Sequence, residues 1–102
     1  MKIPKDRTRQ HRLVAADEIG QQALLFLVEE PGRLDRFLGQ SGLEPAELHA
    51  QASSPDMLLA VLDHLLADES QLLVFAAQIG LEPLDVVRAH RTLAGPEFGD
   101  PA

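Results

Sequence analysis

The sequence has no cysteine, tryptophan or tyrosine, and phenylalanine occurs only four times in 102 residues. The absence of cysteine excludes disulfide bonds, thiol chemistry and thiolate metal sites. With so few aromatic residues, a core must be built from Leu, Val and Ala, which favours packed helices over a β-sheet. Apolar residues still make up 45% of the chain, which is enough for one domain with a single core.

Long hydrophobic runs are also missing. No uninterrupted apolar segment is longer than 23–28, which is far short of the ~20 residues that a membrane-spanning helix needs. No long apolar segment follows the basic N-terminal stretch, as one would in a signal peptide. We therefore expect no membrane contact and a cytoplasmic location.

Basic residues are scarce and lie mainly at one end of the chain. Five of the nine occur in the first twelve positions, and these form a predicted nucleic-acid-binding arm: Lys2, Lys5, Arg7, Arg9 and Arg12. From residue 13 onward, fifteen Asp and Glu face only four Arg, so the body is strongly acidic at neutral pH. An acidic body repels phosphate and attracts cationic partners. Residues 1–12 show no apolar periodicity and contain Pro4, so we expect this arm to be disordered.

One segment of the chain occurs twice. Residues 37–45 and 75–83 share Phe, Gln, Gly, Leu, Glu and Pro at the same offsets, 38 positions apart. The match extends outward, because three further leucines of the first copy coincide with leucines of the second, and His64 takes the place of Phe26. A fixed-period match indicates one supersecondary unit that is used twice, each copy covering the apolar face of the other.

Start and stop signals divide the chain into six predicted helices. Proline in a first helical turn and glycine just after a last turn recur along the chain, and Ser54 and Asp68 are suitable N-caps. The predicted helices are 15–30, 32–41, 45–52, 55–67, 69–79 and 83–93. No segment alternates apolar and polar residues over the length of a strand. The sequence predicts a compact all-helical domain over 13–95, built from two similar three-helix units, with a frayed tail at 96–102.

The repeated turn has the spacing of a helix-turn-helix corner. Ala76, Gly80 and Val86 provide a small residue, a flexible turn and a branched apolar wedge, and positions 38, 42 and 48 repeat this spacing. In DNA-binding units of this type the second helix enters the major groove. Here the second helices begin with carboxylates, whereas phosphate contact requires Lys or Arg. We therefore interpret both turns as tight structural corners.

Two functions follow from these features. The first is a small, acidic, non-catalytic module that binds a partner protein or a second copy of itself through the acidic helix starts, at Glu44, Glu47, Glu82 and Asp85. The alternative is a nucleic-acid-binding accessory that uses the basic arm and the helix-turn-helix-like corner. The arm contains Asp6 and no aromatic residue for base stacking, so we do not expect nucleic acid to be the partner.

Motifs for catalysis, cofactors and metal ions are absent from the sequence. There is no glycine-rich phosphate loop, and no nucleophile or metalloprotease motif. The four histidines do not have metal-ligand spacing, and His64, one helical turn from Asp68, is predicted to fill a partly buried structural position. We expect no enzyme activity, no cofactor and no metal ion.

Four short segments carry a resemblance to a known family. They are Ala23-Leu24-Leu25-Phe26-Leu27, the turn from Phe37 to Pro45, Leu65-Leu66-Ala67-Asp68-Glu69 and Gly80-Leu81-Glu82-Pro83. Through these segments, residues 19–93 resemble a family of small alphaproteobacterial proteins defined by a domain of unknown function (domain of unknown function 3572). The resemblance implies a cytoplasmic bacterial protein and supplies no functional residues.

Overall fold

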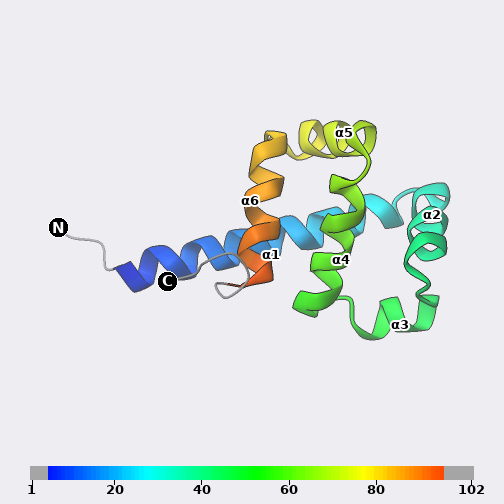
Figure 1. Ribbon diagram of the computed structural model, residues 1–102, viewed down its shortest axis with the longest axis horizontal. Helices are drawn as coiled ribbons and strands as arrows, with labels where there is room; N and C mark the ends of the chain where they lie inside the picture. Colours follow the sequence, from blue (N-terminus) through cyan, green and yellow to red (C-terminus); the bar gives the residue numbers. More distant parts are fainter. Residues whose placement is uncertain (1–4, 96–102) are drawn as a thin grey trace.

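Six α-helices make up the computed structural model, which describes residues 5–95. They are α1 (Lys5–Val28), α2 (Pro31–Ser41), α3 (Pro45–Ala50), α4 (Pro55–Leu66), α5 (Glu69–Ile79) and α6 (Pro83–Ala94) (Figure 1). The described residues contain no strand, so the all-helical prediction is confirmed. Each predicted boundary lies within two residues of the observed one, except for the start of α1. Within residues 5–95, no helix is both long and apolar enough to cross a membrane.

The first helix begins at Lys5 rather than at Ala15, so residues 5–12, which we expected to be disordered, are helical. Pro4 precedes the first helical residue in the sequence, a position where proline does not interrupt a helix. The helix has 24 residues, or about 36 Å at 1.5 Å per residue, and its N-terminal part extends beyond the other helices (Figure 1). Residues 1–4 and the predicted tail at 96–102 lie outside the described residues.

The two copies of the repeated turn have the same local structure. Gly42 and Gly80 follow α2 and α5 with a φ of 75° in each case, a left-handed conformation that costs glycine little. The next helices, α3 and α6, both begin with a capping box. In each box the carboxylate three residues beyond the N-cap accepts a hydrogen bond of 3.0 Å from the N-cap backbone N–H.

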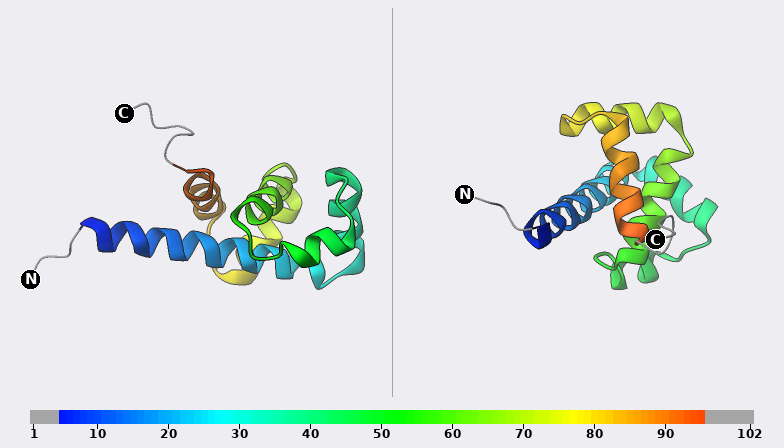
Figure 2. Two further views of the ribbon diagram at one scale, coloured as in Figure 1. Left: turned by 90° about the horizontal axis from the view of Figure 1, so that it is seen from below. Right: turned by 60° about the vertical axis from the view of Figure 1, so that its left-hand side comes forward.

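The core lies where α4 and α6 pack against α1, on the same side of that helix (Figures 1 and 2). Since α6 also packs against α4, these three helices enclose most of the buried apolar surface. The largest fully buried side chains are Phe26, Phe37, Phe75, Leu27, Leu58, Leu62, Leu65, Val61 and Val86. Among the described residues, none of those that are buried is polar or charged.

Two aromatic contacts, called here the exchanged aromatic contacts, each join a ring from the first half of the repeat to a ring from the second half. Phe26 of α1 packs on Phe75 of α5, with tilted rings whose centroids are 5.3 Å apart. Phe37 of α2 packs edge-on against His64 of α4, also at 5.3 Å. Positions 26 and 64, and positions 37 and 75, are counterparts in the 38-residue repeat, so each half supplies one ring to each pair. Consequently α5 lies against α1 as α2 lies against α4.

The third helices of the two halves differ. The short α3 has six residues, buries only Leu48 and lies at the edge of the molecule, beyond α2 (Figure 1). By contrast, α6 has twelve residues, buries Val86 and Ala89, and packs against both α1 and α4. The correspondence between the halves therefore holds for the turns and the aromatic pairs, and not for the placement of the third helices.

Gly20 provides a test of the α1–α4 crossing. A Cβ atom at this buried position would lie only 2.9 Å from Cβ of Leu58. We expect Gly20→Ala to lower the free energy of unfolding by about 1–3 kcal/mol, because overpacking outweighs the better helix propensity of alanine. In the matched control Gly39→Ala, nothing lies within 4 Å of the new Cβ, and stability should rise by roughly 0.5–1 kcal/mol. Urea denaturation measures both changes, and changes of the same sign would contradict the crossing.

Candidate functional site

The four carboxylates predicted to form an interaction surface do not come together. Glu44 and Glu47 begin α3, whereas Glu82 and Asp85 begin α6, and these two helix starts lie at opposite ends of the molecule (Figures 1 and 2). Glu47 and Asp85 each accept the hydrogen bond from the backbone N–H of their N-cap residue. All four side chains are therefore parts of the capping boxes that stabilise these helix starts.

The basic residues predicted to contact nucleic acid lie at the start of the chain. Four of the five, from Lys5 to Arg12, belong to α1, and Lys2 precedes the described residues. The side chains of all five lie outside the described part of the structure. At the second helix-turn-helix-like corner, the first turn of α6 contains the carboxylate of Asp85. The exposed Arg88 on this helix pairs with Asp85 at 3.7 Å, which reduces its availability to a phosphate.

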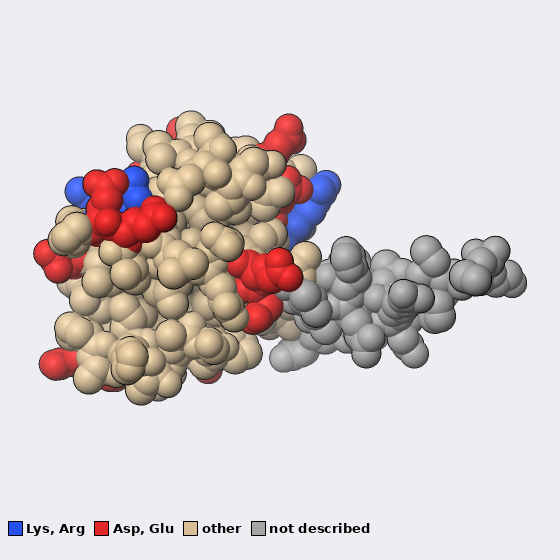
Figure 3. All heavy atoms as spheres, turned by 180° about the vertical axis from the view of Figure 1, so that it is seen from behind, with Lys and Arg blue, Asp and Glu red and all other residues tan. Residues whose placement is uncertain are grey.

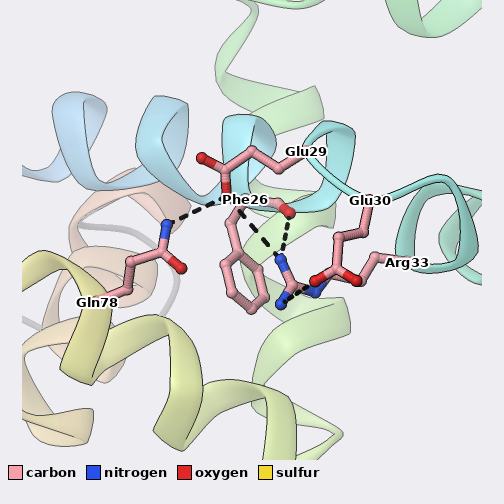
Figure 4. A network of polar contacts seen from close by, with 5 residues as sticks. All are labelled: Phe26, Glu29, Glu30, Arg33 and Gln78. Carbon is pink, nitrogen blue, oxygen red and sulfur yellow. Dashed lines mark hydrogen bonds and ion pairs between the residues drawn. The ribbon is translucent and has the colours of Figure 1, made fainter.

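Arg33 covers the Phe26 ring where α1 meets α2 (Figure 4). Its guanidinium carbon lies 3.8 Å from the ring centroid, and Nη1 donates a hydrogen bond of 3.0 Å to the Phe26 carbonyl. The other nitrogen, Nη2, pairs with Glu30 at 2.7 Å. Gln78 of α5 donates a hydrogen bond of 3.2 Å to Glu29, which extends the cluster to a third helix. Because the guanidinium is occupied by contacts within the chain, we interpret this cluster as structural.

His64, the repeat counterpart of Phe26, has a different environment. Its Nε2 is buried and has no hydrogen-bond partner among the described residues, and the same is true of Oε1 of Gln71, the counterpart of Arg33. Burial has the largest effect on the imidazole and lowers its pKa, while Asp68 raises the pKa and Arg36 lowers it. The net effect is a lowered pKa, so the ring is neutral at pH 7.

An open pocket of about 260 Å³, the His64 pocket, lies between α2 and α4. It is lined by Phe37, Gln40, Ser41, Ala60, Asp63 and His64. Oδ1 of Asp63 contacts Nε2 of His90 on α6 at 2.6 Å, yet the Asp63 side chain remains 65% exposed. The Ser41 hydroxyl donates and accepts hydrogen bonds within its own turn. The pocket therefore presents one accessible carboxylate above a mixed polar and apolar wall.

A larger hollow of about 520 Å³, the α1–α5 groove, lies between α1 and the end of α5. It is lined by Ala15, Glu18, Ile19, Gln22, Gln78, Ile79 and Leu81. Positions 22, 78 and 79 of the groove are the repeat counterparts of positions 60, 40 and 41 of the pocket. The two hollows thus occupy equivalent places in the two halves.

Carboxylates outnumber cations throughout the described body. Residues 15–95 contain thirteen Asp and Glu against four Arg, and three of these arginines pair with a carboxylate of the chain. On the face shown in Figure 3, uncharged atoms cover most of the surface, with carboxylates in separate groups and cations in only two places. No Lys or Arg is among the described residues that line either hollow. Both hollows therefore favour a cationic ligand over an anionic one.

Metal binding finds no support in the described part of the chain, where no three His, Asp or Glu side chains are grouped as a site requires. Sequence reasoning missed the Arg33 cover, the Asp63–His90 contact and the groove. The contact between Arg33 and Phe26 joins residues on either side of the helix boundary at Pro31. The contact between Asp63 and His90 joins residues that are 27 positions apart on different helices, so neither contact has a regular spacing. The acid spacing at the starts of α3 and α6, by contrast, is a capping-box signal that the sequence carries.

Removal of the Arg33 side chain should destabilise the junction of α1, α2 and α5. We expect Arg33→Ala to lower the free energy of unfolding by about 1–2 kcal/mol, because a cation–π contact and a hydrogen bond to a backbone carbonyl are both lost. Arg36→Ala is the control, since Arg36 is 57% exposed and its ion pair with Asp68 is 3.8 Å long; it should cost less than about 0.5 kcal/mol. If urea denaturation gave equal losses of unfolding free energy for the two variants, the contacts of Arg33 with Phe26 would add no stability.

His64 should make the stability fall in mild acid. Because its folded-state pKa lies below the ordinary value of 6.5, the unfolded chain binds more protons between these two values. The contribution of His64 to the free energy of unfolding is thus fully present above about pH 6.5 and is lost as the pH falls through the lower, folded-state pKa. We expect the free energy of unfolding to fall less between about pH 7.5 and about pH 5.5 in His64→Phe than in the parent. Exposed His49→Gln is the control, and a loss unchanged by His64→Phe would contradict the assignment.

The comparisons with known proteins agree with the extent of this fold. No curated protein and no solved structure matches the chain. A family model described as a protein of unknown function (DUF3572) matches residues 14–96, which includes all of α2 to α6 and the part of α1 that packs in the core. The chain belongs to the DUF3572 family.

Proposed function

We propose that the chain is a small, non-catalytic, cytoplasmic protein-interaction module whose acidic body binds a basic, partly apolar segment of a partner protein. The observation that supports this best is the α1–α5 groove. Of the seven described residues that line it, four are apolar and one, Glu18, is charged. Such a hollow suits a ligand that is apolar where it is buried and cationic at its margins.

Exposed apolar side chains extend the groove along both helices. Leu25 lies one turn beyond Gln22 on α1 and is 55% exposed, and Val74 lies one turn before Gln78 on α5 and is 52% exposed. Because residues three or four apart share a helix face, both side chains lie on faces that border the groove. Covering each of them would contribute on the order of 1 kcal/mol to binding.

An amphipathic helix with lysine or arginine on its polar face fits this surface. Helix-in-groove recognition lays the apolar face of an amphipathic helix against an apolar groove, and Ile19, Ile79 and Leu81 supply apolar side chains for such a face. The excess of carboxylates over residues 15–95 attracts such a helix before contact. Glu18 in the groove and Glu29, bonded to Gln78 at its border, supply carboxylates for its cationic side chains.

Nucleic-acid binding through the N-terminal segment is the competing proposal. In its favour, residues 5–12 belong to the part of α1 that extends beyond the other helices (Figure 1). Against it, phosphate would be repelled by that body, and both helix-turn-helix-like corners present carboxylates first. Such binding would depend on residues 1–12 and be lost after nuclease treatment, two properties that a groove-bound protein partner would not share.

Glu44, Glu47, Glu82 and Asp85 remain predicted as secondary contacts for a basic partner. Reversing their charge would weaken α3 and α6 whatever their role in binding, because the same carboxylates hold the capping boxes. Glutamine and asparagine retain an acceptor oxygen while removing the charge. These neutral replacements therefore separate a role in binding from the role in capping.

The neighbouring residues Gln21 and Gln22 offer a matched test of the groove. Both are exposed on α1, but Gln22 lines the groove, whereas Gln21 is hydrogen-bonded to Asp17. We expect Gln22→Lys to reduce capture of a protein from nuclease-treated native extract by about five-fold or more, because it places a like charge against a basic ligand. Gln21→Lys adds the same charge outside the groove and should capture that protein as the parent does.

The same capture with a chain lacking residues 1–12 separates the two proposals. A partner that is retained without these residues and after nuclease treatment, but lost in Gln22→Lys, supports the groove. Equal capture by Gln21→Lys and Gln22→Lys would contradict it. Recovery that disappears with nuclease or without residues 1–12 would favour nucleic acid instead. Circular dichroism of each variant checks that the helical body is intact.

A further inference from the structure

We propose that the His64 pocket receives an arginine side chain of the bound partner and pairs its guanidinium with Asp63. This inference rests on the proposed function in one respect, namely that the arginine belongs to a bound protein. The pocket and the α1–α5 groove have no lining residue in common. A small ligand can therefore test the pocket without reference to the groove.

Asp63 supplies the negative charge. Its carboxylate is 65% exposed, and only Oδ1 is in contact, with His90. The second oxygen, Oδ2, has no hydrogen bond or ion pair among the described residues. A guanidinium can reach this free oxygen from solvent and form a charge-assisted hydrogen bond, for which its planar fork is better suited than an ammonium.

The walls of the pocket suit the rest of an arginine side chain. Ala60, beside the buried Phe37 ring, offers an apolar surface for its methylene stem, and the Gln40 amide offers an acceptor near the opening. None of the described lining residues carries a positive charge, because the His64 ring is neutral at pH 7. At about 260 Å³, the pocket is smaller than the ~300–1,000 Å³ typical of sites for whole small molecules. It therefore suits a single side chain.

The other half of the chain contains its own version of this recognition. There, Arg33 lies over the Phe26 ring and pairs with a carboxylate at the same time. At the counterpart positions the second half has Gln71 and His64, each with a buried polar atom that has no partner among the described residues. Asp68, the counterpart of Glu30, pairs with Arg36 at 3.8 Å, whereas no arginine of the described chain pairs with Asp63, so a partner can supply one there.

The test titrates the full-length protein, labelled with ¹⁵N, with Nα-acetyl-arginine amide near pH 7. Nα-acetyl-citrulline amide, which has nearly the same shape and no charge, is the control ligand. We expect saturable shifts of the Gln40, Ser41 and His64 amide signals with the arginine ligand and not with citrulline. Asp63→Asn should weaken binding about three- to five-fold, as for an exposed ion pair.

His90→Gln distinguishes binding from a structural effect. Both variants alter the contact between Asp63 and His90, but His90→Gln keeps the carboxylate available to the ligand, so we expect binding at least as tight as in the parent. The inference is overturned if the arginine ligand gives no saturable shifts at the pocket, if citrulline binds equally well, or if both variants weaken binding alike. Gln22→Lys should leave this titration unchanged, so failure of the pocket and failure of the groove are read separately.

Discussion

The close crossing of α1 and α4 at Gly20 and Leu58 determines where the other helices lie. Because position 20 has no side chain, Leu58 packs directly on the backbone of α1, and α6 packs against both crossed helices with Val86 and Ala89 buried. The crossing also explains the exchanged aromatic contacts, since α2 and α5 each follow one crossed helix and pack on the other. Each hollow then lies between one crossed helix and the end of the helix that packs on it.

The two aromatic pairs perform the same packing with different chemistry. In one pair both rings are hydrocarbon, and Arg33 covers Phe26 while its charge is balanced by Glu30. In the other pair the ring that replaces Phe26 is the imidazole of His64, which is more polar and is partly buried without a partner for Nε2. Equivalent positions of one fold therefore hold a charge-balanced arginine cluster in one half and a partly buried imidazole in the other.

Most of the fold could be predicted from the sequence because its helix boundaries depend on local signals. Ser54 and Asp68 cap α4 and α5 with hydrogen bonds of 3.1 and 3.2 Å, as their residue types predict, and glycine ends both α2 and α5. The start of α1 was predicted wrongly because weak apolar periodicity does not prevent a helix that continues from a packed segment. The site could not be predicted, since Asp63 and His90, like the two walls of the groove, meet only through the packing of separate helices.

The polarity of position 64 is better explained by binding than by folding. A buried donor or acceptor that lacks a partner costs about 1–3 kcal/mol, and this half of the chain has two such atoms, on Gln71 and on His64, which lines the pocket. Phenylalanine at the counterpart position shows that the fold accepts a hydrocarbon ring there. Among the described residues no hydrogen bond compensates this cost, whereas a polar, uncharged wall beside an accessible carboxylate suits a cationic group. The acidic body attracts cationic groups in general, so the charge of the chain and the chemistry of the pocket both favour the basic partner that we propose.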